Sequence, residues 1–210
     1  RETVGLTRDG DIVIIVADDL GWNAVGYHNS AIATPNIDER IVKRGVELDR
    51  FYVCPMCSPT RAGTMTGRYP IRYGCARSVI PPQRDYGVPT DEVMLPAALA
   101  QCGYTNRGAF GKWHLGHLRK RWHPLSRGFT EFYGCYNGAI DYFTHERNGE
   151  LDWHYDWDSS HDAGYATDLI ADKAAAFIRR SADEAGPFFC YIPFNAPHAP
   201  FQVPKKYESM

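Results

Sequence analysis

The sequence lacks several features that would assign it to a specialised class of protein. Its 25 acidic and 23 basic residues leave a formal net charge of −2, so it has no basic excess of the kind that binds nucleic acid by releasing phosphate counterions. No apolar run approaches the roughly 20 residues that cross a bilayer. Six cysteines in 210 residues are too few for a disulfide-built scaffold, although they permit one or two bridges. We therefore exclude a nucleic-acid binder and a membrane-spanning protein.

The chain also shows no internal repeat, no Gly/Ser linker and no signal-peptide apolar segment at its start. Such a start fits a cytosolic protein, one whose leader has been removed, or an engineered beginning. With 44% hydrophobic residues over 210 positions, the chain is long enough to form one sizeable core or two small ones.

The order of the apolar segments predicts an α/β fold. Residues 12–17 and 187–192 are continuous apolar runs, typical of strands buried on both faces of a parallel sheet. Further strands are expected at residues 46–53 and 104–110. Amphipathic spacing and proline positions predict helices over residues 34–45, from residue 58 onward, and over residues 96–101 and 165–180. This alternation favours a mostly parallel central sheet with helices on both faces.

The first predicted helix has clear start and stop signals. Thr34 is expected to cap its N-terminus and Pro35 to occupy its first position. Ile37 and Ile41 share one face, which we expect to be buried, and Gly45 is expected to end the helix.

Two adjacent carboxylates, Asp18 and Asp19, follow the first predicted strand. Ligands of open α/β sheets bind beyond the carboxyl ends of the strands, and paired carboxylates suit Ca²⁺ or Mg²⁺ better than zinc. A solvated turn would have the same sequence, so both interpretations stay open at this point.

Two further predicted strands are also followed by polar residues suited to a site. Lys112 and His114 provide a positive charge and a proton donor or acceptor; an exposed basic loop is the alternative. The pair of His114 and His117 is a weak zinc pattern without further ligands at familiar spacing. His198 lies in a loop stiffened by prolines, which favours a positioned acid or base but also occurs in plain surface turns.

The segment C-P-M-C-S-P-T-R, which begins at Cys54, allows several interpretations. Ser58 and Pro59 predict a helix start that leaves Cys57 beside unpaired N–H groups, where anions are favoured. Cys54 and Cys57 together resemble a thioredoxin-type dithiol. Alternatively Cys57 alone is reactive, with Arg61 within reach, or both cysteines are inert and merely packed.

Four motifs in this order resemble those of the sulfatase family. They are D-D-L-G at residues 18–21, C-S-P-T-R at residues 57–61, G-K-W-H-L-G at residues 111–116 and P-H-A-P at residues 197–200. The similarity extends from about residue 11 to residue 207. It implies the alkaline-phosphatase-like fold and hydrolysis of an aryl or carbohydrate sulfate ester.

The resemblance also implies a metal and a modified residue. Asp18, Asp19 and Cys57 would hold Ca²⁺, with Mg²⁺ as a possible substitute. Cys57 would be oxidised to formylglycine, whose hydrated aldehyde would offer a hydroxyl to attack sulfur.

Four more residues receive roles from the same resemblance. Arg61 would hold the formylglycine, and Lys112 would bind the sulfate oxygens. His114 would hydrogen-bond the diol and later take its proton. His198 would bind sulfate and help protonate the leaving alcohol.

An aromatic loop at residues 133–145 resembles the corresponding stretch of arylsulfatase B, a family member that acts on sulfated amino sugars. Its aromatic side chains, together with Trp153 and Trp157, would either form a platform for a sugar ring or pack in the core.

The family completes its metal site with an Asp, an Asn and a Lys that lie further downstream. We therefore expect residues 1–210 to be the N-terminal part of a single catalytic domain, without the remainder of that domain or any C-terminal subdomain. The expected partners are a sulfated small molecule or sugar and a formylglycine-generating maturation enzyme. The expected location is extracytoplasmic (periplasmic, secreted or lysosomal), with a signal peptide removed.

Three alternative functions stay open from the sequence. One is a phosphodiester or phosphonate hydrolase of the same superfamily. Another is a thiol oxidoreductase that uses Cys54 and Cys57. The third is a non-catalytic binding protein built on the sulfatase scaffold.

Overall fold

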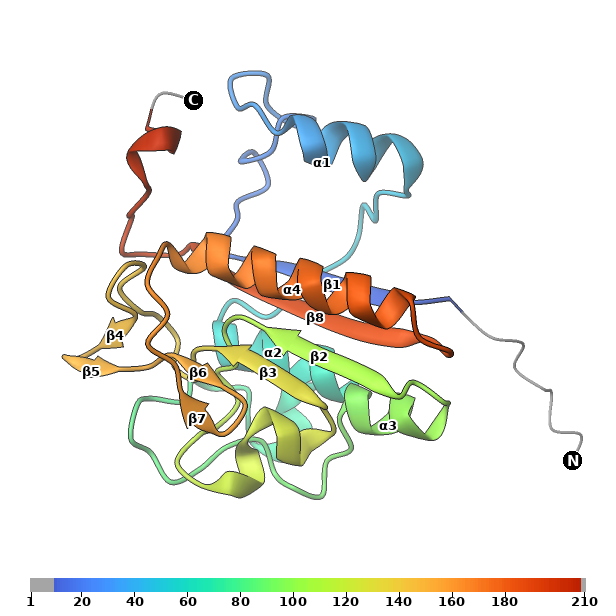
Figure 1. Ribbon diagram of the computed structural model, residues 1–210, viewed down its shortest axis with the longest axis vertical. Coiled ribbons are helices and arrows are strands. Elements are labelled where there is room, and N and C mark those ends of the chain that lie inside the picture. The colour runs from blue at the N-terminus through green and yellow to red at the C-terminus, as the bar shows by residue number, and fades with distance from the viewer. Residues whose placement is uncertain (1–9, 209–210) are drawn as a thin grey trace, which may run out of the picture.

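A six-stranded sheet organises the computed structural model, which describes residues 10–208 (Figure 1). The strand order is β1-β8-β2-β3-β6-β7. The first four strands are parallel to one another, whereas β6 pairs antiparallel with both β3 and β7. The strands are β1 (Ile12–Asp18), β2 (Asn106–Phe110), β3 (Glu131–Gly134), β6 (His154–Tyr155), β7 (Asp158–Ser159) and β8 (Phe188–Pro197). A separate two-stranded ribbon pairs β4 (Glu146–Arg147) with β5 (Glu150–Leu151).

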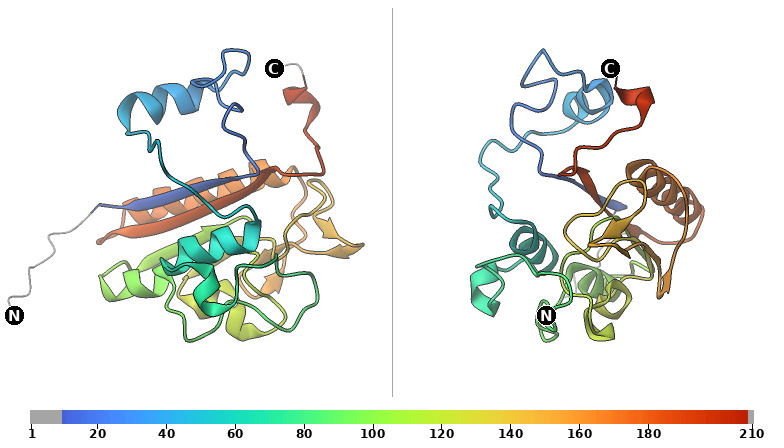
Figure 2. Two further views of the ribbon diagram at one scale, coloured as in Figure 1. Left: turned by 180° about the vertical axis from the view of Figure 1, so that it is seen from behind. Right: turned by 90° about the vertical axis from the view of Figure 1, so that its left-hand side faces the viewer.

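Helices cover both faces of this sheet, as the sequence predicts. The long helix α4 (Ala166–Ala182) lies on one face (Figure 1). The view from behind shows α2 (Cys57–Thr66) and α3 (Leu95–Gln101) on the other (Figure 2). Short 3₁₀ helices lie at Val42–Arg44, Pro70–Tyr73, Lys120–Trp122, Pro124–Arg127 and Lys205–Tyr207.

Strand β8 shows how the two layers are separated. Its residues Phe188, Cys190 and Ile192 pack in the core cluster that includes the inner face of α4. The alternate residues Phe189 and Tyr191 pack in the cluster that includes Ala62 and Met65 of α2. Because side chains alternate across a strand, an apolar run without interruption fills both cores.

Strand β1 departs from the prediction of burial on both faces. Its side chains alternate between partly buried and exposed, and Val13 and Ile15 are 42% and 56% exposed. The register places Val13 beside Cys190, on the face that α4 covers. However, α4 packs over β8, β2 and β3, so the outer strand is left uncovered on that face.

Two further predictions are wrong in the segment between β1 and α2. Residues 46–53 form no strand, and their side chains are largely exposed. The predicted helix at 34–45 is only α1 (Pro35–Arg40) followed by a 3₁₀ turn, and Ile37 and Ile41 are exposed. Thr34 occupies the N-cap position and Pro35 begins the helix, as predicted, but the Thr34 hydroxyl makes no capping bond; it accepts from Gly26 N–H and donates to Asp38. These apolar residues match helix and strand patterns, but α1 projects away from the sheet (Figure 1), so nothing in the described chain covers them.

No helix among residues 10–208 has the length and apolarity needed to cross a bilayer. The predicted processing of the N-terminus concerns residues outside this described part of the chain.

A buried histidine makes the stability of the fold depend on pH. His123 Nδ1 accepts from Leu125 N–H at 3.2 Å, and Nε2 donates to the Asp156 carbonyl at 2.8 Å. This pairing requires the neutral ring, and burial lowers the pKa of His123 to about 4.

We predict that the protein loses stability as the pH falls from about 6.5 toward 4. In this range His123 binds a proton in the unfolded chain but stays neutral in the folded protein. The variant His123→Asn keeps an acceptor near Leu125 but cannot titrate, so its unfolding free energy should fall less between pH 7 and pH 5. Urea denaturation at both pH values measures the difference. The variant His161→Asn, at an exposed histidine, is the control for the loss of one imidazole group; an equal change in both variants would contradict the assignment.

Candidate active site

The predicted site residues lie at one edge of the sheet, where the parallel strands end. Asp18 ends β1, Lys112 is the second residue after β2, and His198 directly follows β8. Two backbone hydrogen bonds connect these strand ends: Lys112 N–H donates to the Pro193 carbonyl at 2.8 Å, and His198 N–H donates to the Asp18 carbonyl at 2.5 Å. Distant parts of the sequence therefore meet at the edge where α/β sheets place their sites.

A buried carboxylate forms the centre of the site. Asp18 is only 5% exposed, and its Oδ2 accepts from Arg61 at 2.7 Å and from the Lys112 ammonium. Arg61 also donates to the Lys112 carbonyl at 2.6 Å. Burial by itself would raise the pKa of Asp18, but Arg61 and Lys112 more than offset it and hold that pKa well below its ordinary value. The group is therefore a carboxylate shared by two buried cations.

Cys57 lies next to this carboxylate, at the beginning of α2. Its Sγ is 3.6 Å from Asp18 Oδ1, as a thiol that donates to the carboxylate. The helix begins at Cys57 with Met56 at the N-cap, so the prediction that Cys57 lies at a helix mouth is confirmed. The predicted cap is wrong: Ser58 and Pro59 lie inside the first turn, and the Ser58 hydroxyl accepts from the buried Ile80 N–H at 3.0 Å.

Asp18, Asp19 and Cys57 could together hold a cation. One ligand atom from each lies within 4.8 Å of the others, and a cavity of about 310 Å³ opens between the end of β1 and the start of α2. Asp19 is 76% exposed at its side chain, and its hydrogen bond to Asp18, with some burial, raises its pKa. Because two neighbouring carboxylates repel each other, a bound cation would relieve that repulsion. Within the described residues no second group of three such side chains is this close, so the weak zinc pattern of His114 and His117 finds no support.

His114 is buried beside the site as a neutral base. Burial, followed by the charges of Lys112 and Arg61, lowers its pKa to about 3. Its Nε2 donates to the Ile80 carbonyl at 3.0 Å, and its Nδ1 has no hydrogen-bond partner within the described chain. The ring therefore directs a free lone pair from Nδ1.

His198 lies at the more exposed rim. Its Nε2 is 3.8 Å from Asp19 Oδ2, and its Nδ1 is 2.6 Å from the Ala199 carbonyl. The imidazole therefore lies beside Asp19, at the solvent side of the cluster.

The aromatic residues proposed as a sugar platform are mostly core. Tyr133 and Trp153 are completely buried and contact each other edge to face, so neither can contact a sugar. Trp157 is exposed but stacks on His123 at 3.9 Å, at the turn after β6. The platform prediction is therefore wrong for Trp153.

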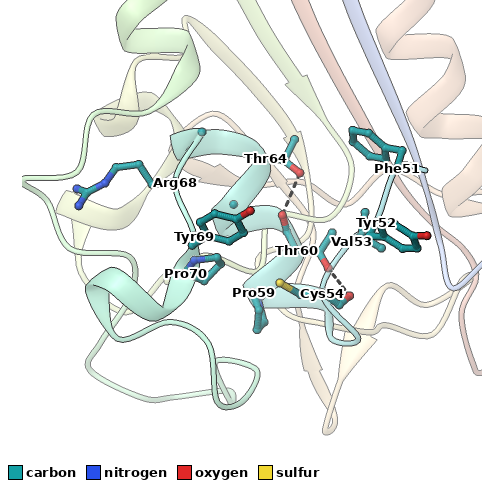
Figure 3. Close-up of a pocket in the computed structure, with 12 residues that line it drawn as sticks. Phe51, Tyr52, Val53, Cys54, Pro59, Thr60, Thr64, Arg68, Tyr69 and Pro70 are labelled. Carbon is teal, nitrogen blue, oxygen red and sulfur yellow. Dashed lines mark hydrogen bonds between the residues drawn. The ribbon is translucent and has the colours of Figure 1, made fainter. Parts of the chain in front are cut away.

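A larger apolar hollow of about 540 Å³ adjoins the other side of α2. Figure 3 shows Tyr52 and Tyr69 on either side of Cys54 and Thr60. Thr60 Oγ1 donates to the Cys54 carbonyl at 2.7 Å. Cys54 and Cys57 are both free thiols, so the structure contains no disulfide between them.

Sequence reasoning missed the residues that support His114. Ile80 bonds its ring, and Gly138 packs so closely that an added Cβ would lie 2.4 Å from His114 Cε1. Asp152 in turn accepts from the backbone N–H groups of Tyr136 and Asn137 at 2.9 Å. None of these contacts has a local sequence signal, because each joins segments that are far apart along the chain.

Comparison with known proteins relates nearly the whole chain to one family. The model of the family described as Sulfatase matches residues 10–210. Arylsulfatase J of Mus musculus is 35% identical over 96% of this chain and 34% of its own length. N-acetylgalactosamine-6-sulfatase of Rattus norvegicus is 35% identical over 97% of this chain and 42% of its own length. The chain thus spans less than half of these relatives.

Solved structures give the same relationship. The crystal structure of Ps i-CgsB in complex with k-i-k-neocarrahexaose superposes with a TM-score of 0.86 at 33% identity, covering 94% of this chain and 47% of that one. PsFucS1 sulfatase from Pseudoalteromonas sp. superposes with a TM-score of 0.76 at 25% identity, covering 94% and 46%.

We predict that the charge of Asp18 is essential for stability, whereas that of Asp19 is not. Asp18→Asn leaves Arg61 and Lys112 buried without a counter-charge, which should cost about 3–5 kcal/mol of unfolding free energy. Asp19→Asn, at an exposed carboxylate, should change it by no more than about 0.5 kcal/mol. Chemical denaturation in the presence of a chelator measures both variants without a contribution from bound metal. Equal effects would show that the buried ion triad does not stabilise the fold.

Proposed function

The chain belongs to the sulfatase family, and from that membership we propose that the protein containing it hydrolyses a sulfate ester at the site around Cys57. The observation that carries the proposal is the buried arrangement of Asp18, Arg61 and Lys112 beside the Cys57 thiol. With two cations and one carboxylate, this arrangement places a net positive charge in a desolvated region next to a reactive residue, where it can stabilise the charge of a transferring sulfuryl group.

We propose that Cys57 is the precursor of formylglycine. A maturation enzyme supplies the oxidant for that conversion, which the thiol cannot undergo alone. The modified residue then supplies a hydroxyl nucleophile as its hydrated aldehyde. Arg61, held by Asp18 on one side and the Lys112 carbonyl on the other, orients the first turn of the helix on which this residue lies.

The metal-binding residues fit a hard cation. Asp18 and Asp19 provide carboxylate oxygens, and position 57 lies with them in one cluster, so these three would hold Ca²⁺, or Mg²⁺ in its place. The cation would act as a Lewis acid toward sulfate and nucleophile oxygens. Since Ca²⁺ takes about 6–8 oxygen ligands, we propose that further ligands come from residues outside those described.

The remaining residues are suited to two tasks, charge stabilisation and proton transfer. Lys112 provides a buried positive charge for the sulfate oxygens. His114 is neutral, and the free lone pair on its Nδ1 suits the removal of a proton from the nucleophile's second hydroxyl. His198, at the exposed rim, is suited to bind sulfate and protonate the leaving alcohol.

We propose that the substrate is a sulfated carbohydrate. One relative is named an N-acetylgalactosamine-6-sulfatase, and one superposed structure contains a neocarrahexaose. The site edge is open, with a cavity of about 310 Å³ at the metal-binding residues, which leaves room for a sugar ring. From family membership we also propose that the protein acts outside the cytosol.

We also propose that residues 1–210 are the N-terminal part of a larger catalytic domain. The chain covers 34% to 42% of the length of two curated relatives. An apolar groove of about 590 Å³ lies above β1, lined by residues including Ile15, Trp22 and Phe51, all of which are exposed. Uncovered apolar surface of this extent is typical of a domain face that contacts more protein.

We predict that the peptide containing Cys57, isolated after co-expression with a formylglycine-generating enzyme, is about 18 Da lighter than its cysteine form. Mass spectrometry of the full-length protein measures this change. In the same preparation Cys57→Ala should lower kcat on an aryl sulfate by about 10³-fold or more, because the nucleophile is lost.

Cys54→Ser is the matched control, since it removes the neighbouring thiol but not the proposed nucleophile; it should remain active. Loss of activity in Cys54→Ser together with an unmodified Cys57 would favour the oxidoreductase hypothesis. Faster turnover of an aryl phosphate than of the sulfate would instead favour the phosphoester hydrolase.

We further predict that activity depends on a divalent cation held by the two aspartates. Chelation should abolish activity, and Ca²⁺ should restore it. Asp19→Asn should raise the Ca²⁺ concentration needed for half-maximal recovery, because one carboxylate ligand is replaced by a neutral one. Calcium titrations of activity and of bound metal measure this shift, and full activity in the metal-free protein would contradict the site.

A further inference from the structure

We propose that Ser58 is a positioning residue that fixes the orientation and tautomer of His114 through the backbone of Ile80. The proposal rests on the proposed function only in assigning His114 a role as proton acceptor. It gives the second residue of the C-S-P-T-R segment a task that is distinct from capping its helix.

Two hydrogen bonds connect Ser58 to the imidazole. The Ile80 N–H donates to Ser58 Oγ at 3.0 Å, and the Ile80 carbonyl accepts from His114 Nε2 at 3.0 Å. Ser58, Ile80 and His114 are 1%, 3% and 5% exposed. Both bonds are therefore made away from solvent, where breaking either leaves a buried polar group without a partner.

The Ile80 carbonyl decides which ring nitrogen carries the proton. A carbonyl oxygen only accepts, so Nε2 must be protonated, and in a neutral ring Nδ1 then keeps its lone pair. Nδ1 is buried and has no partner in the described chain. Loss of the bond to Ile80 would allow the other tautomer, in which Nδ1 is a donor and cannot remove a proton.

Ile80 depends on a hydrogen bond from another segment because its own segment has no regular secondary structure to hold it. It lies outside any helix or strand and is followed by Pro81 and Pro82, which have no N–H group to donate. The bond to Ser58 Oγ thus holds the N–H side of Ile80, whose carbonyl accepts from the ring.

The rest of the histidine is already constrained. The backbone of His114 is left-handed (φ 57°), and its N–H donates to the Tyr136 carbonyl at 3.0 Å. Gly138 closes one side of the ring. Because these contacts fix the backbone and one side of the ring, the tautomer is selected by the hydrogen bond to the Ile80 carbonyl.

Ser58 also follows Cys57 directly on the first turn of α2. One helical turn therefore places both the proposed nucleophile and, through Ile80, the proposed base. A shift of this turn would displace the proposed nucleophile and would also disturb the hydrogen bond that holds the proposed base, so the geometry of proton transfer depends on this one turn.

The test compares Ser58→Ala with Ser58→Thr in the full-length enzyme. Ser58→Ala removes the acceptor and should lower kcat on an aryl sulfate by about 10- to 100-fold, with little change in KM, as for residues that orient a catalytic group. Ser58→Thr keeps the hydroxyl, and a cavity of about 200 Å³ next to residue 58 has room for the added methyl group, so activity should be retained. Rates are normalised to the formylglycine content of each variant, so that a defect in maturation is separated from a defect in positioning.

Ser181→Ala is the matched control for loss of a buried serine. Ser181 lies on α4 and is 1% exposed, and its hydroxyl has no partner within the described chain. It should leave kcat unchanged. In a His114→Ala background, Ser58→Ala should cause almost no further loss, because its effect passes through the ring.

Histidine ¹⁵N NMR provides a readout independent of activity. The His114 spectrum of the wild-type protein should show a protonated Nε2 and an unprotonated Nδ1, and Ser58→Ala should add the opposite tautomer or broaden both signals. Unchanged nitrogen shifts in Ser58→Ala, unchanged kcat, or losses that multiply with those of His114→Ala would each overturn the proposal. If wild type hydrolyses no sulfate ester, the proposed function fails, whereas the NMR comparison still tests the positioning.

Discussion

The burial of Asp18 between Arg61 and Lys112 is the interaction on which the site depends. Each of the three charges would be costly to bury alone; Asp18 is stabilised by both cations, and each cation is stabilised by Asp18. The triad joins the end of β1, the first turns of α2 and the segment after β2. A displacement of any of these elements would leave an unpaired buried charge, so electrostatics and tertiary structure specify the same arrangement.

The sheet provides the surface on which this triad forms. Parallel strands β1, β8 and β2 end at one edge, and backbone hydrogen bonds between their following segments keep these ends in register. The two core clusters on opposite faces hold β8 and β2 from both sides, and β1 from one side. A rigid edge of this kind can hold charged groups at fixed distances, which a preorganised site requires.

The same first turn of α2 serves several parts of the site. Cys57 contacts Asp18, Ser58 anchors Ile80, and Arg61 bonds both Asp18 and the Lys112 carbonyl. The short segment that resembles the sulfatase motif is thus an organising element as well as a source of the proposed nucleophile. In the proposed mechanism a cysteine alone would therefore not suffice, because its neighbours position the groups proposed to act with it.

The sequence by itself determined the α/β class, the helices on both faces and the residue types of the site, because apolar periodicity and motif spacing are local properties. It could not decide that residues 46–53 form no strand, or that β1 is covered on one face only, since these outcomes depend on whether a distant element packs there. From the sequence, the Ser58 hydroxyl was expected to cap its own helix. It could not be predicted that this hydroxyl instead accepts from Ile80, 22 residues away. Tertiary structure decided these features because a buried hydrogen-bonding group takes whichever partner the fold brings within reach.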